Sequence, residues 1–357
     1  MSETISGPSF FIGKGDDNDL ISFGSGQPDL PPPKEAFGVL NGYEGFKYGL
    51  IQGEEKLRVE LAKEYPNARP EQFVITNGAS EAIDLVLRVI SKPSAPVLLP
   101  RPYYYSYPWN VTYAGMIPAY YDLKEGGKID FIDFEKSIGG CRAVMINSPS
   151  NPTGTVQEID TLRKIEVLCD QLGIYVISDE VYKDLIYERE NYLLNGKHIV
   201  TVNSFSKTYA MCGLRVGYVY SQDVDLIEKI IEMKTHTSMN TSIVGQQMAL
   251  AAIQTPKSYV ENHVTIWKER RDMMYKGLLD LGLEVWKPEG AFYVLPKFKN
   301  SGQVINDLYH KYRVIAYDGA WFGAPEHVRF SYALDVAKIE EGLRRLKEFM
   351  GKEYKEY

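Results

Sequence analysis

Short apolar runs alternate with longer amphipathic segments between residues 73 and 220. Seven of these runs have the length and the β-branched or aromatic content of strands: Phe73–Thr76, Val97–Leu99, Met116–Tyr121, Ala143–Ile146, Ile174–Ile177, Ile199–Val202 and Val216–Tyr220. Helical patterns lie between them, and one of these, Ile159–Leu172, is followed by Gly173, a residue that favours the left-handed backbone of a helix end. The alternation predicts an α/β fold, with a mostly parallel seven-stranded sheet sandwiched by helices.

Two helical segments, Val224–Met233 and Val244–Ile253, follow the last of these strands, and the pattern changes from about residue 256 onward. A long helix comes first there, and shorter alternating segments and a terminal helix follow: Val260–Leu281, Leu283–Trp286, Ala291–Leu295, Val314–Tyr317, Val328–Tyr332 and Val336–Met350. This order is typical of a smaller α+β domain. We therefore expect a large domain over residues 40–260 and a small domain over 1–39 and 261–357. Residues 1–20 are polar and Gly-rich and are expected to form an arm, and Leu20–Phe23 is a short strand candidate.

Composition and charge exclude several classes of protein. The 357 residues are 44% hydrophobic and 24% charged, with a net charge of −7 and no basic run, which argues against a nucleic-acid partner. No apolar run is long enough to span a membrane, and the first residues lack the features of a secretory signal. The three cysteines lack metal-ligand spacing and the five histidines are scattered, so we expect no metal site and a cytoplasmic protein.

Unusual polar residues fall at the ends of the predicted strands. Ligands of open α/β sheets bind at the carboxyl ends of the strands, and six strand ends of this chain carry such residues: Gly78-Ala79-Ser80, Tyr104, Asn151, Asp179 with Tyr182, Ser204 with Lys207, and Arg215. Each has a plainer interpretation by itself. Ser80 would cap a helix, Asn151 would bond its own turn, and Asp179 would pair with a lysine or arginine, while Tyr104 would pack and Lys207 would lie on the surface. Together they indicate one ligand site.

The chemistry of these groups matches a single cofactor. A phosphate is bound well by a helix N-terminus, hydroxyl groups and an arginine, while a flat ring stacks on an aromatic side chain. A ring nitrogen that must stay protonated is stabilised by a carboxylate. A phenolate oxygen accepts hydrogen bonds from neutral donors, and an aldehyde reacts with a lysine amine. The ligand with all of these groups is pyridoxal 5′-phosphate, whose characteristic partners include a Schiff-base lysine and an acidic residue at the pyridine nitrogen.

At this level of detail the sequence resembles the fold-type I, class I/II aminotransferases. The resemblance covers about residues 20–350 and rests on motifs in the family's order: Ser204-x-Ser206-Lys207 with Gly213-x-Arg215-x-Gly217-Tyr218, Asn147-x-Pro149-x-Asn151-Pro152-Thr153-Gly154, Asp179-x-x-Tyr182 and Arg329-Phe330-Ser331. Any one of these motifs is weak by itself, and their combination is highly specific.

The resemblance implies a role for each of these residues. Lys207 would form the Schiff base with the cofactor. The phosphate would be held by Gly78, Ala79, Ser80, Ser204 and Arg215, the ring by Tyr104 and Asp179, and the ring oxygen by Asn151 and Tyr182. Arg329 would bind the substrate carboxylate near Gly26, although a surface salt bridge is the plainer interpretation of an arginine. Tyr48 resembles the residue that reaches the neighbouring subunit's phosphate, which implies a homodimer with shared active sites.

The implied activity is amino-group transfer between an L-amino acid and a 2-oxo acid, with Lys207 moving a proton between the substrate carbon and the cofactor. A carbon–sulfur β-lyase or an amino-acid decarboxylase of the same fold remains an alternative. A non-catalytic regulator would need a DNA-binding module, and the chain shows no spare domain or basic face. Aspartate, aromatic amino acids and histidinol phosphate are all open as substrates, because no second arginine or lysine for an acidic side chain is evident. The segment before Ile21 also departs from the family, since it is shorter and more polar than the arm of many relatives.

Overall fold

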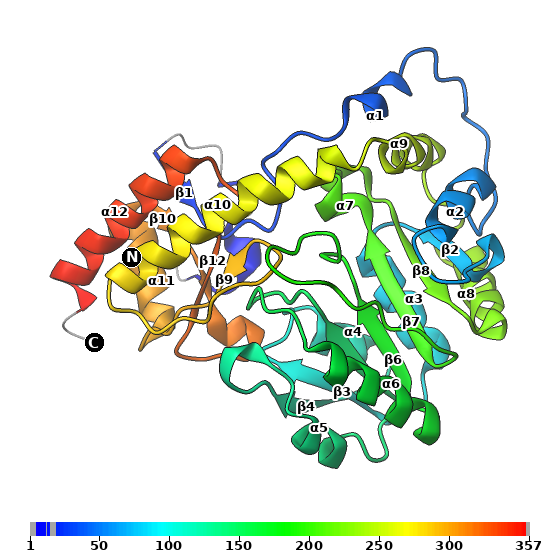
Figure 1. The fold of residues 1–357 in the computed structure, drawn as a ribbon, viewed down its shortest axis with the longest axis horizontal. Coiled ribbons are helices and arrows are strands. Elements are labelled where there is room, and N and C mark those ends of the chain that lie inside the picture. Colours follow the sequence, from blue (N-terminus) through cyan, green and yellow to red (C-terminus); the bar gives the residue numbers. More distant parts are fainter. Residues whose placement is uncertain (1–4, 12, 15–18, 355–357) are drawn as a thin grey trace.

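A seven-stranded sheet forms the centre of the larger part of the molecule (Figure 1). The computed structural model describes residues 5–11, 13–14 and 19–354. The strands are β2 (Phe73–Thr76), β3 (Pro96–Arg101), β4 (Ile117–Asp122), β5 (Ala143–Asn147), β6 (Tyr175–Asp179), β7 (Ile199–Ser204) and β8 (Gly217–Ser221), in the order β2-β8-β7-β6-β5-β3-β4. Only β8 runs antiparallel to its neighbours β7 and β2, so the predicted mostly parallel sheet is confirmed.

Helices cover both faces of this sheet, because side chains of a strand point alternately to opposite faces and both faces are apolar. On one face lie α3 (Ala79–Ile90), α4 (Tyr107–Tyr113) and α8 (Val224–His236). On the other face lie α2 (Glu55–Ala62), α5 (Phe131–Ser137), α6 (Ile159–Leu172) and α9 (Ile243–Ile253), while α1 (Lys34–Gly38) packs against α9. Helix α6 ends at Gly173, which has a φ of 65°, as its sequence predicts.

The remaining elements form the smaller part of the molecule. Strand β1 (Ile21–Ser22) pairs in parallel with β10 (Val314–Ile315), and β11 (Tyr317–Asp318), β12 (Val328–Ser331) and β9 (Tyr293–Val294) form an antiparallel sheet. Three helices, α10 (Ser258–Asp280), α11 (Ser301–Tyr312) and α12 (Val336–Lys352), pack around these strands. Helix α10 runs from the side of α9 to the small sheets (Figure 1). Short 3₁₀ segments lie at Pro8–Phe11, Pro70–Gln72, Glu125–Gly127, Cys212–Leu214 and Gly319–Phe322, and α7 (Phe205–Thr208) follows β7.

Three expectations about local structure are corrected. Leu283–Trp286 forms no strand, since its side chains pack into the core from an irregular segment whose Glu284 carbonyl accepts a hydrogen bond from the Lys297 amide. The four-residue spacing of Leu57, Leu61 and Tyr65 favours a single helix, but α2 ends at Ala62, so Tyr65 packs with Leu57 and Leu61 from beyond the helix. The expected arm is partly core, because Phe11 and Leu20 are buried against Ile315. Residues 1–4, 12 and 15–18 of that arm lie outside the described residues.

We propose that residues 40–260 form the large domain and residues 1–39 with 261–357 the small one. Separate hydrophobic clusters support this division: three pack on the faces of the large sheet, and another lies around the small sheets. Two groups of residues cross this division. Ala36 of α1 packs with Leu57 and Leu61 of α2 on the large sheet, and Val181, Tyr182 and Leu185 belong to the cluster around the small sheets. None of the described helices has the length and apolar character needed to cross a membrane.

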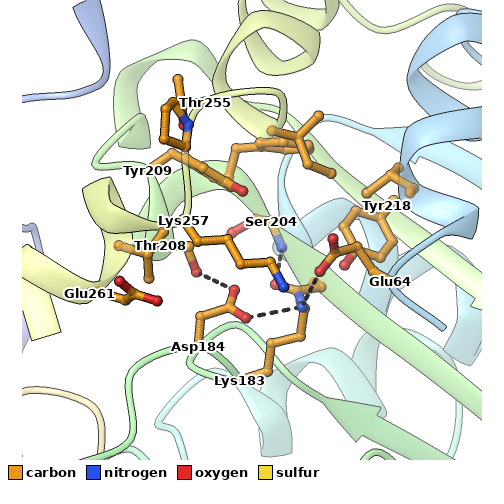
Figure 2. A pocket seen from close by; sticks show the side chains of 16 residues that line it. Glu64, Lys183, Asp184, Ser204, Thr208, Tyr209, Tyr218, Thr255, Lys257 and Glu261 are labelled. Atoms are coloured by element: carbon orange, nitrogen blue, oxygen red, sulfur yellow. Dashed lines mark hydrogen bonds and ion pairs between the residues drawn. The ribbon is translucent and has the colours of Figure 1, made fainter.

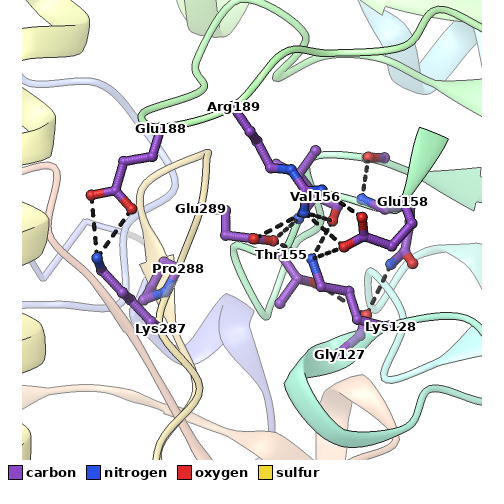
Figure 3. A network of polar contacts seen from close by, with 12 residues as sticks. Gly127, Lys128, Thr155, Val156, Glu158, Glu188, Arg189, Lys287, Pro288 and Glu289 are labelled. Carbon is purple, nitrogen blue, oxygen red and sulfur yellow. Dashed lines mark hydrogen bonds and ion pairs between the residues drawn. The ribbon is translucent and has the colours of Figure 1, made fainter.

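An ion-pair network joins the loop before β9 to the large sheet's connections (Figure 3). The Glu289 carboxylate accepts hydrogen bonds from Lys128 Nζ, from Arg189 Nη1 at 3.0 Å and from the Val156 amide at 3.1 Å. The same two cations also contact Glu158. Because Glu289 lies a few residues before β9, this network fixes where β9 meets the large domain.

Candidate active site

A cavity of about 680 Å³ opens at the carboxyl ends of the parallel strands and is closed on its other side by β1, β9, β11 and β12. Eleven of the thirteen residues singled out in the sequence line it: Gly26, Ala79, Ser80, Tyr104, Asn151, Asp179, Tyr182, Ser204, Lys207, Arg215 and Arg329. The other two, Gly78 and Tyr48, are not among the lining residues. Gly78 lies against the Arg215 guanidinium, and the Tyr48 side chain is 83% exposed.

One end of the cavity is an anion cradle. Gly78, with a φ of 81°, is the N-cap of α3, so the first amides of this twelve-residue helix point outward unpaired. Ser80 is therefore inside the first turn, and the interpretation of Ser80 as the cap is wrong. A Cβ atom on Gly78 would lie 2.4 Å from Arg215 Nη2, and one on Gly217 would lie 2.6 Å from the Gly78 carbonyl carbon. Only glycine allows these close approaches.

The direction of β8 explains how Arg215 reaches this cradle. Because β8 is antiparallel, its first residues lie at the same edge of the sheet as the last residues of β7. Arg215 precedes β8 in a left-handed conformation with a φ of 55°, and its Nη1 donates to the Cys212 carbonyl at 2.9 Å. Ser204, the last residue of β7, caps α7 by accepting the Ser206 amide through its Oγ at 3.3 Å. The Ser204 hydroxyl, the Arg215 guanidinium and the first amides of α3 thus lie at the same end of the cavity.

Lys207 lies in α7, directly after β7, and its amine projects into the cavity. The Nζ atom donates a hydrogen bond to the carbonyl of Gly26, which comes from the loop after β1. A Cβ on Gly26 would lie 3.9 Å from this amine and 2.5 Å from the Tyr293 hydroxyl, so glycine is needed there for space. The interpretation of Lys207 as an ordinary surface lysine is therefore wrong, because its side chain is part-buried inside a cavity.

Asp179 ends β6 with its carboxylate almost fully buried. The Tyr107 hydroxyl donates to Oδ2 at 2.5 Å, and the Val181 amide donates to Oδ1 at 3.3 Å. No lysine or arginine pairs with it among the described residues, so the expected ion pair is replaced by a phenol. Burial raises the pKa of Asp179 to about 6, although the Tyr107 hydrogen bond and the Lys207 charge oppose that rise.

The raised pKa of Asp179 makes stability depend on pH. The native carboxyl holds its proton more tightly than an unfolded one, whose pKa is near 3.8. The free energy of unfolding therefore falls as the pH rises from about 4 to 6, by on the order of 3 kcal/mol. We expect Asp179→Asn to remove this fall in the cofactor-free protein, measured by urea unfolding at a series of pH values.

The neighbouring Glu180 supplies a comparison for this measurement. It is buried on the other side of β6 and accepts hydrogen bonds from Ser178 and Tyr65, and burial raises its pKa to about 7. Glu180→Gln should flatten the pH dependence in a higher window, between about 4.5 and 7. An Asp179→Asn protein that keeps the wild-type slope between pH 4 and 6 would contradict the assignment of that window to Asp179.

Asn151 and Tyr182 face the centre of the cavity. The Asn151 Oδ1 atom accepts Nη1 of Arg329 at 3.0 Å, and its backbone amide donates to the Asn147 side chain at 2.8 Å. Asn151 therefore presents its amide hydrogens to a ligand. The Tyr182 hydroxyl lies 2.9 Å from that of Tyr293, and burial raises the pKa of Tyr182 well above that of an ordinary tyrosine. Both residues are neutral groups with hydrogens to donate.

Arg329, on β12, is a buried cation without a carboxylate partner among the described residues. Its side chain is 2% exposed, its Nη2 donates to the Gly24 carbonyl at 2.6 Å, and its Nε is buried with no hydrogen-bond acceptor. Aromatic rings of Tyr293, Tyr317 and Phe322 lie within 4.8 Å of the guanidinium carbon. The surface salt bridge is excluded. An uncompensated buried guanidinium is costly, and its fork geometry matches an incoming carboxylate.

A second, smaller cavity of about 380 Å³ lies behind α7 and does not share this chemistry (Figure 2). Its buried amine, Lys183 Nζ, is already paired with Glu64 at 3.2 Å and Asp184 at 3.0 Å, and Thr208 also donates to Asp184. Within the described part of the chain, no group of three or more His, Cys, Asp or Glu side chains could hold a metal ion.

Several residues of the site were not assigned from the sequence. Tyr107, Tyr293 and Asn147 were given no role. Asn147 holds the site together by donating to the Asp179 carbonyl at 3.0 Å and accepting the Asn151 amide. Its place in the Asn147–Gly154 motif was the available signal. Tyr293 had none, since its contacts come from residues 111 and 36 positions away in the chain.

Known proteins resemble this chain over most of its length. A profile of the family described as aminotransferase class I and II matches residues 18–346. A probable aspartate/prephenate aminotransferase from Aquifex aeolicus is 34% identical over 358 residues, which cover 92% of this chain and 90% of that protein. An aspartate aminotransferase from Bacillus subtilis is 30% identical, over 94% of this chain and 92% of that protein.

Solved structures have the same fold. Aspartate aminotransferase from Thermotoga maritima matches with a TM-score of 0.89 at 30% identity, over 97% of this chain and 95% of that chain. An aromatic aminotransferase from Pyrococcus horikoshii matches with a TM-score of 0.88 at 30% identity, over 94% and 96% of the two chains.

Proposed function

Because the chain belongs to the class I and II aminotransferase family, we propose that its cavity binds pyridoxal 5′-phosphate through Lys207 and exchanges amino groups between an L-amino acid and a 2-oxo acid. The chain is a transaminase by family. The observation that carries the proposal is the buried, unpaired guanidinium of Arg329, which faces the same cavity as the Lys207 amine.

The residues present fit the cofactor. The glycine-lined cradle of Gly78, Gly217 and Arg215 accepts a phosphate at the N-terminus of α3. The Asp179 carboxylate, held by Tyr107, is available for a ring nitrogen, and Tyr104 supplies an aromatic face at the cavity wall. The Asn151 amide and the Tyr182 hydroxyl are the neutral donors for a ring oxygen.

When bound, the cofactor supplies a conjugated ring that accepts electrons from the substrate's α-carbon. The protein's part is to position and to move protons. Arg329 binds the α-carboxylate through two parallel hydrogen bonds and so fixes which substrate bond faces the ring. The Lys207 amine would act as the base that takes the proton from the substrate's α-carbon and would return it to the cofactor. Asp179 keeps positive charge at the ring nitrogen.

The lining of the cavity favours an aromatic amino acid as donor. Among the described residues, its cations are Lys207, Arg215 and Arg329, and each has a part in holding cofactor or α-carboxylate. No lining cation remains for the second carboxylate of aspartate. Rings form much of the wall instead: Phe11, Tyr104, Tyr105, Tyr293 and Tyr317. An aromatic donor differs from aspartate, the amino acid in the names of the Aquifex aeolicus and Bacillus subtilis relatives.

Adding single amino acids to the cofactor-loaded protein tests both parts of this function. We expect phenylalanine or tyrosine to bleach the visible absorption band at concentrations about tenfold or more below those of aspartate, with histidinol phosphate also weak. A protein that forms no visible band with pyridoxal 5′-phosphate would refute the cofactor. A preference for aspartate would refute only the donor class and would direct attention to Lys14, next to the cavity residue Gly13.

Product analysis separates the alternatives within this cofactor class. A transaminase yields a 2-oxo acid and a stoichiometric new amino acid, whereas a carbon–sulfur β-lyase would release ammonia and pyruvate, and a decarboxylase would release an amine.

We propose a homodimer with shared active sites and a cytoplasmic location. The dimer is supported by Phe46 and Tyr48, which are 85% and 83% exposed on one loop and available to a second copy. The location is supported by the three cysteines, which are all free thiols.

A further inference from the structure

Tyr293 contacts several parts of the site, and its hydroxyl has no role in the function described so far. Its side chain is 1% exposed, on β9 of the small domain. Its hydroxyl lies 2.9 Å from that of Tyr182, and its ring lies 4.5 Å from the Arg329 guanidinium carbon. The same hydroxyl also lies where a Cβ atom of residue 26 would be. The contact between the Tyr182 and Tyr293 hydroxyl groups thus joins the two proposed domains at this cavity.

We propose that Tyr293 is a positioning residue that donates a hydrogen bond to the Tyr182 hydroxyl and thereby directs the single Tyr182 proton to the ring oxygen of the cofactor. The proposal rests on the proposed function, since it needs a ligand with such an oxygen.

The number of protons that each tyrosine hydroxyl can donate determines the direction of this hydrogen bond. A phenol has one proton to donate and two lone pairs that accept. Once Tyr182 donates to a ligand, its contact with Tyr293 persists only if Tyr293 is the donor. Chains of hydrogen bonds polarise one another, so a proton received from Tyr293 strengthens the bond that Tyr182 donates. The charged groups around the pair are Arg329 from β12, Asp179 from β6 and Lys207 from α7. They remain unchanged when only the Tyr293 hydroxyl is removed.

Tyr293→Phe should therefore change the titration of the cofactor-loaded protein. A hydrogen bond to an oxygen that carries negative charge stabilises the deprotonated form of the conjugated ligand, so weakening it moves the midpoint of the visible band to higher pH. We expect a rise of about half a unit to one unit in Tyr293→Phe and a larger rise in Tyr182→Phe. The readout is the absorption spectrum as a function of pH, without substrate.

A double-mutant cycle distinguishes positioning from a merely structural role. If Tyr293 acts through Tyr182, adding Tyr293→Phe to Tyr182→Phe should move the midpoint no further. The matched control is Tyr332→Phe. Tyr332 is also fully buried, in the same hydrophobic cluster, but its hydroxyl donates to the Ala291 carbonyl at 3.3 Å and does not line the cavity. Its loss should leave the midpoint within about 0.2 units of wild type, since it touches no ligand group.

Either of two results would overturn the role of Tyr293. One is a wild-type midpoint in Tyr293→Phe, and the other is an equal shift in the presence and absence of Tyr182. A wild-type protein without any titrating band would instead refute the proposed function, so the two failures are distinguishable. A shift equal to that of Tyr332→Phe would mean that the loss of any core hydroxyl has this effect and would also reject the proposal.

Discussion

Lys207→Ala should lower kcat by at least about 10³-fold, because one amine both anchors the cofactor and moves the substrate proton. The structure gives no substitute base at this position, since the cavity's other described cations are the guanidinium groups of Arg215 and Arg329. The measurement is the steady-state rate of 2-oxo acid formation with saturating cofactor. The spectrum of the loaded variant should also lose the pH-dependent band.

Lys257→Ala is the control for the loss of a lysine. Lys257 lies on the other side of α7, where it lines the second cavity with an exposed side chain (Figure 2). Its replacement should leave kcat within about twofold of wild type, as is usual for surface substitutions. Turnover by Lys207→Ala at the rate of Lys257→Ala would disprove the assigned chemistry.

Arg329→Lys should reduce kcat/KM for an amino acid by roughly 10²-fold, even though it keeps the positive charge. The guanidinium meets Asn151, Gly24 and three aromatic faces at once, while its unpaired Nε remains for the substrate. A lysine amine is a point charge and cannot reproduce this planar set of donors. Losing one hydrogen-bonded partner of a buried charge costs about 3 kcal/mol, which corresponds to that factor.

The control for Arg329 is a substrate without a carboxylate. The amine that corresponds to the preferred amino acid should react slowly with the wild-type protein and equally slowly with Arg329→Lys. If the substitution slowed the amine as much as the amino acid, Arg329 would be supporting the fold of the site and not binding the carboxylate.

Most of the fold and of the site follows from local sequence. The seven strands of the large sheet are visible because each is an apolar run bounded by turn residues, and the site is visible because the carboxyl ends of parallel strands meet at one edge. Arg215 is a less direct case. It falls at this edge only because β8 is antiparallel, a property that hydrophobic pattern does not reveal.

The features that sequence did not reveal depend on tertiary packing. Leu283 and Val285 alternate like a strand, yet they pack into the core from an irregular segment. The partner of Asp179 is a tyrosine from α4 and not a cation, because a buried carboxylate can be satisfied by any donor that the fold delivers. The Tyr182–Tyr293 contact needs both domains in place. No local pattern encodes such pairings.

The hydrogen bond from Arg329 to the Gly24 carbonyl spans 305 positions of the chain. The proposed phosphate cradle, in contrast, is assembled from the start of α3, the end of β7 and the residues just before β8, all of which belong to the large sheet and its connections. A folding molecule therefore gains its two recognition functions in sequence, since long loops close late. A chain with only the large sheet complete would capture cofactor while still unable to select or turn over an amino acid. The amount of bound cofactor would then measure only the folding of the large sheet, whereas catalytic turnover would measure the folding of the whole molecule.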